Sequence, residues 1–441
     1  MTNLKIGLCG TGNVGSAFLE SIVSTESLIN RNYGLNISIS LIGARKGKVS
    51  GAPDIPVITD IQELAMSDDV DVVVELIGGV DDAYKLAVSA LKNKKHLSDE
   101  DMVSYQKRNL INIKSPNPSV ETFLHAFLPF KYVDHTHADA ILNVTNRPRG
   151  LSFCKKIFGN KVSIVPYVMP GFKLSKKVSE IYSKNPKINC LILMNHGIFT
   201  FSNDAKEAYS LMIKYVSQAE RAIKKLKVKK IKQIKNYSTK FSTHDIAPII
   251  RGLSSNNNDQ KFIVNYRLNK DLKYFMNGKN VRSYSSKGTA TPDHVIRVKP
   301  FPLIITPKKN SSIDEFKVTA KKAFENYRKK YINSFSVHKN KVKEKKEMLA
   351  TSPRVVLVQN VGVFTAGKDL NSAKIAGDLT ETNAKVIASV EETSTYKFIP
   401  EKDLFDVEYW SLEQAKIKKP KKLLEGNVVV ITGSTGTIGF E

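Results

Sequence analysis

Residues 132–141, YVDHTHADAI, decide how the central part of this 441-residue chain is interpreted. If they form a strand, His135 and His137 point to the same face of a sheet, because side chains alternate between the two faces. Two imidazoles side by side in this way can share one metal ion. Taken alone, a His-x-His pair is more typical of surface or core packing than of metal binding, so the surrounding sequence has to decide between the two.

A third histidine strengthens the metal interpretation. His196 follows an apolar, strand-like segment at residues 190–195 and precedes Gly197. Three histidines that leave one coordination position open are the usual plan of a catalytic zinc site. Neutral imidazoles leave the ion its full positive charge, which lets it polarise a ketone as a Lewis acid. His135, His137 and His196 are therefore candidate Zn²⁺ ligands, with surface or core packing still the alternative.

An acidic residue precedes the histidine pair. Residues 118–125, PSVETFLH, contain Glu121, which by itself fits a helix cap as well as a catalytic carboxylate. The order Pro-Ser-x-Glu, His-x-His and Asn-His-Gly resembles the class II aldolase/adducin family. The resemblance implies that Glu121 shuttles a proton and that the three histidines hold zinc. We expect His125 and His294 to pack or to support the site rather than to bind the ion.

The resemblance continues through residues 291–297, 362–368 and 404–413. Within the family it is nearest to a bifunctional form that joins a rhamnulose-phosphate aldolase to a short-chain dehydrogenase. It implies an α/β/α domain with a central, mostly antiparallel sheet over residues 98–410. It also implies cleavage of a ketose 1-phosphate of the rhamnulose type to dihydroxyacetone phosphate and a lactaldehyde. We expect a homo-oligomer with a small phosphorylated sugar as its substrate.

The amino-terminal residues predict a nucleotide-binding fold. Residues 4–19, LKIGLCGTGNVGSAFL, read as a strand, the pattern G-x-G-x-x-G and a helix. The first glycine allows a tight turn, the second a close approach of pyrophosphate, and the third close packing of helix and strand. A glycine-rich turn of another α/β domain is the alternative. The predicted nucleotide-binding residues of this turn are Gly10, Gly12, Asn13, Val14 and Gly15.

The next predicted strand, residues 37–43, ends at Arg45 and Lys46. Basic residues here suit the 2′-phosphate of NADP better than the acidic residue expected for NAD. Residues 41–45, 54–60 and 73–79 resemble the amino-terminal domain of homoserine dehydrogenase. The resemblance implies NAD(P) as cofactor and a partial Rossmann domain.

The carboxy-terminal residues 427–441 predict a strand followed by T-G-x-x-G-x-x-G. They resemble the first turn of a short-chain dehydrogenase, although Thr437 stands where glycine is common. We therefore expect the start of a second Rossmann domain, with residues 412–425 as its connection. The α/β chain is predicted to divide into a partial Rossmann domain at residues 1–97, an aldolase-like domain at 98–410 and a dehydrogenase start at 411–441.

This combination leaves alternatives open. The family's usual Gly/Ser-rich phosphate-gripping segment would precede residue 98, where a homoserine dehydrogenase fragment stands instead. We therefore expect a chimeric or truncated chain, or a natural fusion, with impaired aldol cleavage. An NAD(P)-dependent oxidoreductase of the homoserine or lactaldehyde dehydrogenase type is disfavoured because the homoserine catalytic segment is missing. An inactive, adducin-like interaction protein is disfavoured by Glu121 and the three histidines.

Amino-acid composition limits the classes of binding partner and the cellular compartment that we expect. The formal net charge is +26, yet the lysines are spread along the chain. The densest run, residues 223–235, has its apolar residues on one helical stripe, so its lysines are expected to be a solvated face. We expect no nucleic-acid or membrane partner. Three scattered cysteines and the lack of an apolar run of ~18 residues indicate a cytoplasmic protein.

Overall fold

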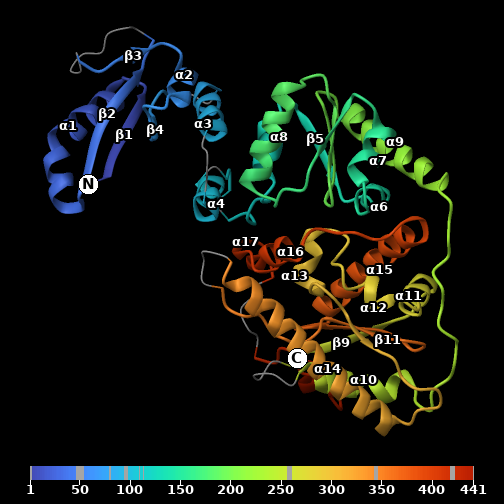
Figure 1. Ribbon diagram of the computed structural model, residues 1–441. Coiled ribbons are helices and arrows are strands. Elements are labelled where there is room, and N and C mark those ends of the chain that lie inside the picture. The colour runs from blue at the N-terminus through green and yellow to red at the C-terminus, as the bar shows by residue number, and fades with distance from the viewer. Residues whose placement is uncertain are drawn as a thin grey trace. The chain divides into compact units, whose positions relative to one another are not determined.

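The computed structural model describes residues 2–45, 54–78, 81–93, 98–108, 110–112, 114–255, 261–341, 346–417 and 423–440. The chain is an α/β protein with two compact units (Figure 1). The first unit comprises Met1–Pro129 and Pro170–Lys184, and the second comprises Phe130–Met169 and Asn185–Glu441. Parts of the ranges used in the sequence predictions lie outside the described residues, namely Lys46, Gly79, residues 94–97 and residues 418–422 among others.

The first unit contains a parallel four-stranded sheet in the order β3-β2-β1-β4. Ile6, Leu8 and Ile42 from the sheet pack against Leu19 from a helix in one buried cluster. Parallel strands that alternate with helices give the Rossmann-type half that the sequence predicts. The strands are β1 Thr2–Cys9, β2 Leu35–Gly43, β3 Val57–Ile58 and β4 Val72–Glu75. The helices are α1 Asn13–Tyr33, α2 Ile61–Met66, α3 Asp81–Asn93, α4 Asp99–Arg108, α5 Thr122–Phe127 and α8 Phe172–Lys184.

The second unit contains two mixed four-stranded sheets, in which antiparallel pairs outnumber parallel ones. The first sheet has the order β5-β8-β7-β6, with β5 Tyr132–Thr136, β6 Val162–Val165, β7 Cys190–Leu193 and β8 Gly197–Ser202. The second has the order β9-β12-β11-β10, with β9 Ile263–Arg267, β10 Leu303–Ile305, β11 Val355–Val358 and β12 Gly362–Gly367. The helices beside the first sheet are α6 Asp139–Thr145, α7 Gly150–Phe158 and α9 Ala205–Lys224.

The second sheet is covered on both faces. Val355, Leu357 and Val363 point into one buried cluster, whereas Val356, Val358 and Phe364 point into another. This alternation follows from the two-residue period of a strand and gives three layers. The principal helices are α10 Thr243–Ser254, α11 Lys270–Met276, α12 Val281–Tyr284, α13 Val295–Val298, α14 Ile313–Lys339, α15 Leu370–Thr393, α16 Glu401–Glu408 and α17 Ser411–Ala415.

The two sheets share one topology. In each, an edge strand lies antiparallel to the second strand of a tight hairpin, and the first strand of that hairpin is parallel to the other edge. The registers correspond as well, since Thr136 lies opposite Ile198 and Arg267 lies opposite Val363. Each hairpin turn contains an asparagine with positive φ, Asn195 at 59° and Asn360 at 64°. The second unit is therefore an internal structural repeat.

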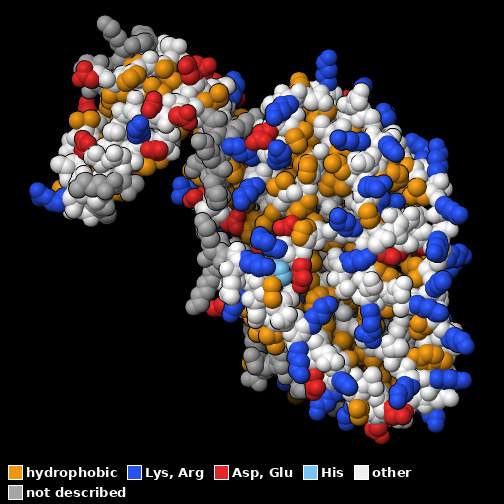
Figure 2. All heavy atoms as spheres, viewed as in Figure 1, with side chains coloured by type: hydrophobic (Ala, Val, Ile, Leu, Met, Phe, Trp, Pro, Cys, Tyr) orange, Lys and Arg blue, Asp and Glu red, His pale blue; other side chains and the backbone are white. Residues whose placement is uncertain are grey.

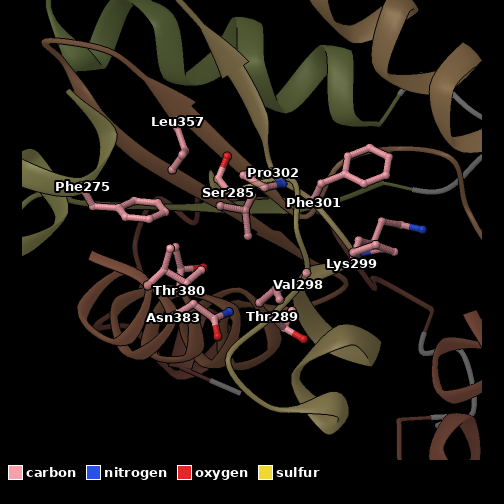
Figure 3. Close-up of a pocket in the computed structure, with 14 residues that line it drawn as sticks. Phe275, Ser285, Thr289, Val298, Lys299, Phe301, Pro302, Leu357, Thr380 and Asn383 are labelled. Atoms are coloured by element: carbon pink, nitrogen blue, oxygen red, sulfur yellow. The ribbon is translucent and has the colours of Figure 1, made fainter. Parts of the chain in front are cut away.

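A buried ion pair lies in the second half of this repeat. The Lys299 ammonium is 3.5 Å from a carboxylate oxygen of Glu408 and 3.6 Å from the centre of the Tyr331 ring. The Tyr331 hydroxyl donates to the same carboxylate at 2.8 Å. Burial lowers the pKa of Lys299 to about 8, although Glu408 opposes the shift. Lys299 also lines a cavity of about 40 Å³, shown in Figure 3, which has room for a few waters at most.

Two sequence predictions about secondary structure are wrong. Residues 427–431 form no strand, and Val430 is 86% exposed, because no strand in the described part of the chain lies beside them to accept their backbone hydrogen bonds. The helix predicted across residues 223–235 ends instead at Lys224, and the following lysines are exposed on an extended segment. The lysines are solvated as expected, but the apolar Ile231 packs from that extended segment rather than from a helix.

Lysine and arginine side chains are spread over the face of the molecule seen in Figure 2 rather than gathered in one stripe. In the parts of the chain that the structure describes, no helix is both long enough and apolar enough to cross a membrane.

Candidate metal centre

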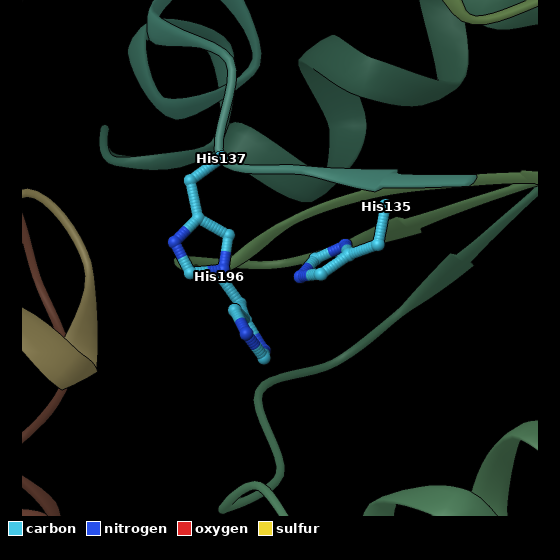
Figure 4. A group of neighbouring side chains, drawn as sticks. All are labelled: His135, His137 and His196. Atoms are coloured by element: carbon cyan, nitrogen blue, oxygen red, sulfur yellow. The ribbon is translucent and has the colours of Figure 1, made fainter. Parts of the chain in front are cut away.

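The structure brings the three predicted histidines together (Figure 4). His135 lies on β5, His137 directly follows that strand, and His196 lies in the turn between β7 and β8. One nitrogen from each ring lies within 4.8 Å of the nitrogens of the other two. The three side chains thus come from two segments that meet because β5 pairs with β8.

Glycine at position 197 permits this approach. A Cβ atom there would lie 2.5 Å from the Thr136 carbonyl oxygen. It would also lie 3.0 Å from carbon atoms of the His135 and His137 rings. These distances are shorter than van der Waals contact, so a larger residue would push the rings away from the turn.

His135 has a fixed orientation. Its Nδ1 lies 2.9 Å from the Ile198 carbonyl oxygen, which only accepts, so Nδ1 carries the proton. Its ring also stacks on Phe199 with centroids 3.9 Å apart and an interplanar angle of 9°. In this tautomer Nε2 carries the lone pair that a metal ion would bind.

The three rings fit a divalent ion of the zinc type. Neutral imidazole nitrogens are good ligands for Zn²⁺, and a three-histidine set leaves coordination positions for substrate oxygens. Two ring pairs have centroids 4.8 and 4.9 Å apart and the third pair 5.4 Å. His196 is 4% exposed, whereas the side chain of His137 is 28% exposed, so the site is open on one side.

An aspartate that the sequence analysis did not single out stands beside this group. Asp293 places a carboxylate oxygen 3.5 Å from Nδ1 of His137 and accepts a hydrogen bond from the Thr291 hydroxyl. Burial alone raises the pKa of the Asp293 carboxyl, but His137, His294 and this hydrogen bond lower it by more. Asp293 lies within residues 291–297, which resemble the aldolase family, so this segment was a signal in the sequence, although the sequence does not show that the carboxylate reaches His137.

His294 packs, as expected, rather than joining the ligand group. It is 7% exposed, and its Nδ1 lies 2.9 Å from the side-chain oxygen of Asn383 on α15. That oxygen also accepts from the backbone N–H of Ala290 at 2.8 Å. The Asn383 side-chain atom accepts from a backbone N–H, so it is the amide oxygen and not the amide nitrogen. An oxygen can only accept, so Nδ1 of His294 is the donor.

Glu121 and His125 belong to the other compact unit. Glu121 precedes α5 as its cap residue, and its backbone N–H lies 3.2 Å from the Ser119 hydroxyl. The helix carries Phe123 and Phe127, which pack edge-on against Phe172 of α8 in the same unit. His125 is exposed in the last turn of α5.

The predicted nucleotide turn has its expected local form. Gly10 has a φ of 97°, and a Cβ there would lie 2.5 Å from the Leu76 carbonyl oxygen. Gly12 caps α1, and Asn13, Val14 and Gly15 form its first turn. A cavity of about 910 Å³ lies in this unit and is lined by Gly10, Gly12 and Arg45. Asn13, Val14 and Gly15 do not line it.

Three known protein families match parts of this chain. The class II aldolase and adducin N-terminal domain matches residues 86–223, and the second domain of class II aldolases matches residues 241–417. The chain carries class II aldolase domains. The NAD-binding domain of homoserine dehydrogenase matches residues 10–98. The chain therefore combines two kinds of enzyme domain.

Individual relatives show the same division. An uncharacterised oxidoreductase, YuxG of Bacillus subtilis strain 168, is 30% identical over 362 residues, which are 80% of this chain and 52% of that protein. The chain thus spans about half the length of this curated relative. Homoserine dehydrogenase of Pseudomonas aeruginosa is 36% identical over 100 residues, which are 22% of this chain and 23% of that enzyme.

Among solved structures, the N-terminal class II aldolase domain of a conserved protein from Thermoplasma acidophilum is 46% identical to this chain. The match covers 31% of this chain and 62% of that chain, with a TM-score of 0.29.

Proposed function

We propose that this chain is a metal-dependent class II aldolase in which His135, His137 and His196 hold one divalent ion, with Zn²⁺ as the first candidate. The observation that carries the proposal is the convergence of one nitrogen from each ring within 4.8 Å. The rings come from two separate segments, and Gly197 leaves space for two of them, so the arrangement is built into the hairpin. The match to class II aldolase domains supports the same reaction class.

His135, His137 and His196 would hold the ion, which when bound would supply the Lewis acidity needed to polarise a substrate ketone. Glu121 takes the proton from the hydroxyl on C4, and the O–H electron pair becomes the new aldehyde C=O bond. The C3–C4 bond breaks, and its electron pair is delocalised towards the ketone oxygen. Glu121 then returns the proton to C3. The role of Glu121 rests on the Pro118-Ser119-x-Glu121 motif.

We propose a ketose 1-phosphate of the rhamnulose type as the substrate, with dihydroxyacetone phosphate and a lactaldehyde as products. The support is the family resemblance of the motifs around residues 118–125, 291–297 and 362–368. The net charge of +26 gives a positive potential that favours an anionic, phosphorylated substrate.

The test has two readouts on the full chain, metal content and aldol cleavage. The purified protein is expected to contain one divalent ion per chain, and His196→Ala is expected to lose it. His244→Ala is the matched control, because His244 is exposed at the start of α10 and lies outside the ligand group. Wild-type protein that binds no divalent ion would end the proposal.

Cleavage of a panel of ketose 1-phosphates is followed by coupled reduction of dihydroxyacetone phosphate. Glu121→Gln is expected to lower kcat by at least ~10²-fold with the metal content unchanged, because the amide cannot carry a proton. Glu220→Gln, on the exposed face of α9, is the control. If Glu121→Gln retains full activity, another group moves the proton.

A second function is favoured by the first unit. We propose that residues 10–98 bind NAD(P), with Gly10 and Gly12 at the pyrophosphate and Arg45 at the ribose end of the 910 Å³ cavity. Fluorescence titration should show tighter binding of NADPH than of NADH. Arg45→Ala is expected to remove that preference, whereas Arg31→Ala, at the exposed end of α1, should keep it. Equal affinities in the wild type would refute the NADP assignment but not nucleotide binding.

A further inference from the structure

The turn that carries Asp293 belongs to the second half of the structural repeat but is attached to both halves. Its residues Pro292–His294 form one short 3-10 turn directly before α13. On one side Asn383 of α15 accepts from Ala290 and from His294. On the other side the side-chain amide of Asn146, a fully buried residue that caps α6, donates to the Ala290 carbonyl at 2.8 Å.

The same asparagine reaches the metal hairpin. The Asn146 side-chain oxygen accepts a hydrogen bond from the Asn195 amide at 3.0 Å, and Asn195 is the residue before His196. A continuous line of hydrogen bonds thus joins the turn of His196 to the turn of Asp293. The hydrogen bonds to Ala290 and between His294 and Asn383 are buried and the one from Asn195 is partly buried, so breaking them is costly and the two turns are held in a fixed relation.

Asp293 is placed to act on a ligand rather than on the ion. Its carboxylate is 3.5 Å from Nδ1 of His137. Among the described residues, the group of nearby ligand-type side chains consists of the three histidines and does not include Asp293. His137 presents its Cδ2 edge, which adjoins Nε2, to Gly197. Nδ1 therefore faces the carboxylate, and Nε2 is the nitrogen that would bind the ion.

Metal-binding histidines usually donate their second ring N–H to a carboxylate or a carbonyl, which fixes the tautomer and the direction of the ring. The Ile198 carbonyl does this for His135. We infer that Asp293 does it for His137 and is a positioning residue of the metal centre, so that the second aldolase domain completes the site built on the first. This inference rests on the proposed function, since it requires that the three histidines hold an ion.

Metal affinity of the full chain tests the inference. Zn²⁺ affinity is measured by competition with a chromophoric chelator, and the geometry of the site by the visible absorption of the Co²⁺-loaded protein. Asp293→Asn is expected to weaken Zn²⁺ binding about 10–100-fold and to change the Co²⁺ spectrum, because the amide can present its NH₂ group to His137 and no longer enforces one tautomer. Asp293→Glu keeps the charge and should restore affinity to within about 5-fold of the wild type.

Asp378→Asn is the matched control. Asp378 lies in the same half, pairs with Arg267 at 2.6 Å and is largely exposed. It should leave both readouts unchanged. Asn383→Ala, which removes the acceptor that holds the Asp293 turn, should weaken Zn²⁺ binding less than Asp293→Asn does.

The outcomes separate the two proposals. If the wild type binds no ion, the proposed function fails and the role of Asp293 falls with it. If the wild type binds one ion and Asp293→Asn binds it equally well with an unchanged Co²⁺ spectrum, the positioning role is overturned while the aldolase proposal stands. If Asp293→Glu binds Zn²⁺ as weakly as Asp293→Asn does, a carboxylate at this position is not what supports the affinity, and the inference is also overturned.

Discussion

The two hairpins of the second unit have one backbone plan and different side chains. Asn195-His196-Gly197-Ile198-Phe199-Thr200 corresponds to Asn360-Val361-Gly362-Val363-Phe364-Thr365. In the register of the neighbouring edge strands, His135 corresponds to Tyr266 and His137 to Leu268. The positions of the three proposed ligands in the first half are thus held by tyrosine, leucine and valine in the second.

What the halves share is the framework. A threonine of each second hairpin strand, Thr200 or Thr365, donates to a carbonyl of the following helix at 3.0 and 2.8 Å. Each half also has a buried asparagine, Asn146 or Asn277, that caps a helix and hydrogen-bonds to the hairpin asparagine. Since the second half folds in the same way without the histidines, the histidines are not required by the fold, which supports a functional reason for them.

The strongest test of this comparison installs the missing ligands. The combined variant Tyr266→His, Leu268→His and Val361→His is expected to raise the metal content from one ion per chain to two, because the backbone positions already correspond. Metal analysis after removal of free ion gives the count. Tyr266→Phe alone is the control and should leave the count at one. A folded triple variant that still binds one ion would show that the two hairpins differ in more than their side chains.

The buried asparagines should matter equally for stability and unequally for metal binding. Asn146→Ala and Asn277→Ala are each expected to lower the free energy of unfolding by about 1–3 kcal/mol, since each leaves buried partners without a hydrogen bond. The fluorescence of Trp410, the single tryptophan, reports urea unfolding of this unit. Asn146→Ala should also weaken Zn²⁺ binding, whereas Asn277→Ala should not. The reverse order of metal affinities would contradict the comparison.

Glycine should be required in the first hairpin and dispensable in a helix of the second half. Gly197→Ala places a Cβ against the Thr136 carbonyl and two histidine rings, so it should destabilise the unit by about 1–3 kcal/mol and weaken metal binding. Gly252→Ala in α10 meets no atom within 4 Å and should stabilise the helix by about 0.5–1 kcal/mol. Urea midpoints followed by Trp410 measure both. A neutral Gly197→Ala would mean that the rings can move aside.

The smallest expected effect is an equal loss of stability when one threonine hydroxyl is removed from either half. Thr200→Val and Thr365→Val each remove one hydroxyl that donates to a helix carbonyl while keeping the shape of the side chain. Each should cost about 1 kcal/mol. The two urea midpoints should agree closely, because the bonds are equivalent in the two halves. Unequal losses would show that the framework has diverged along with the ligands.

The sequence predicted the local features that depend on short patterns. The glycine turn after β1 follows from the order of strand, turn and helix in the sequence. The position of His135 on β5 follows from the two-residue period of a strand. Both could be located without the structure. The class II aldolase domains and the NAD-binding domain were recognisable for the same reason, as ordered motifs.

Features that depend on pairing between distant segments were missed. The strand predicted at residues 427–431 has the composition of a strand but no partner beside it in the described residues. Asp293 is far in sequence from His137, and only the fold brings them to 3.5 Å. The repeat itself left a visible signal, because Asn-His-Gly-Ile-Phe-Thr recurs as Asn-Val-Gly-Val-Phe-Thr. The zinc ligands and Glu121 remain predictions about function.

The buried pair of Lys299 and Glu408 gives the second half an unusual alkaline behaviour. The folded-state pKa of Lys299 is about 8, below the ordinary value of 10.5 that applies to the unfolded chain. Between these two pH values the unfolded chain binds more protons than the folded one, so the contribution of this lysine to stability rises with pH. Below about pH 8 the buried charge opposes folding in full. Burial raises the pKa of the Cys154 and Cys190 thiols above 9.0, which works in the opposite direction at higher pH. Lys299→Met should therefore reduce the rise in the thermal midpoint of the second unit between about pH 8 and pH 9.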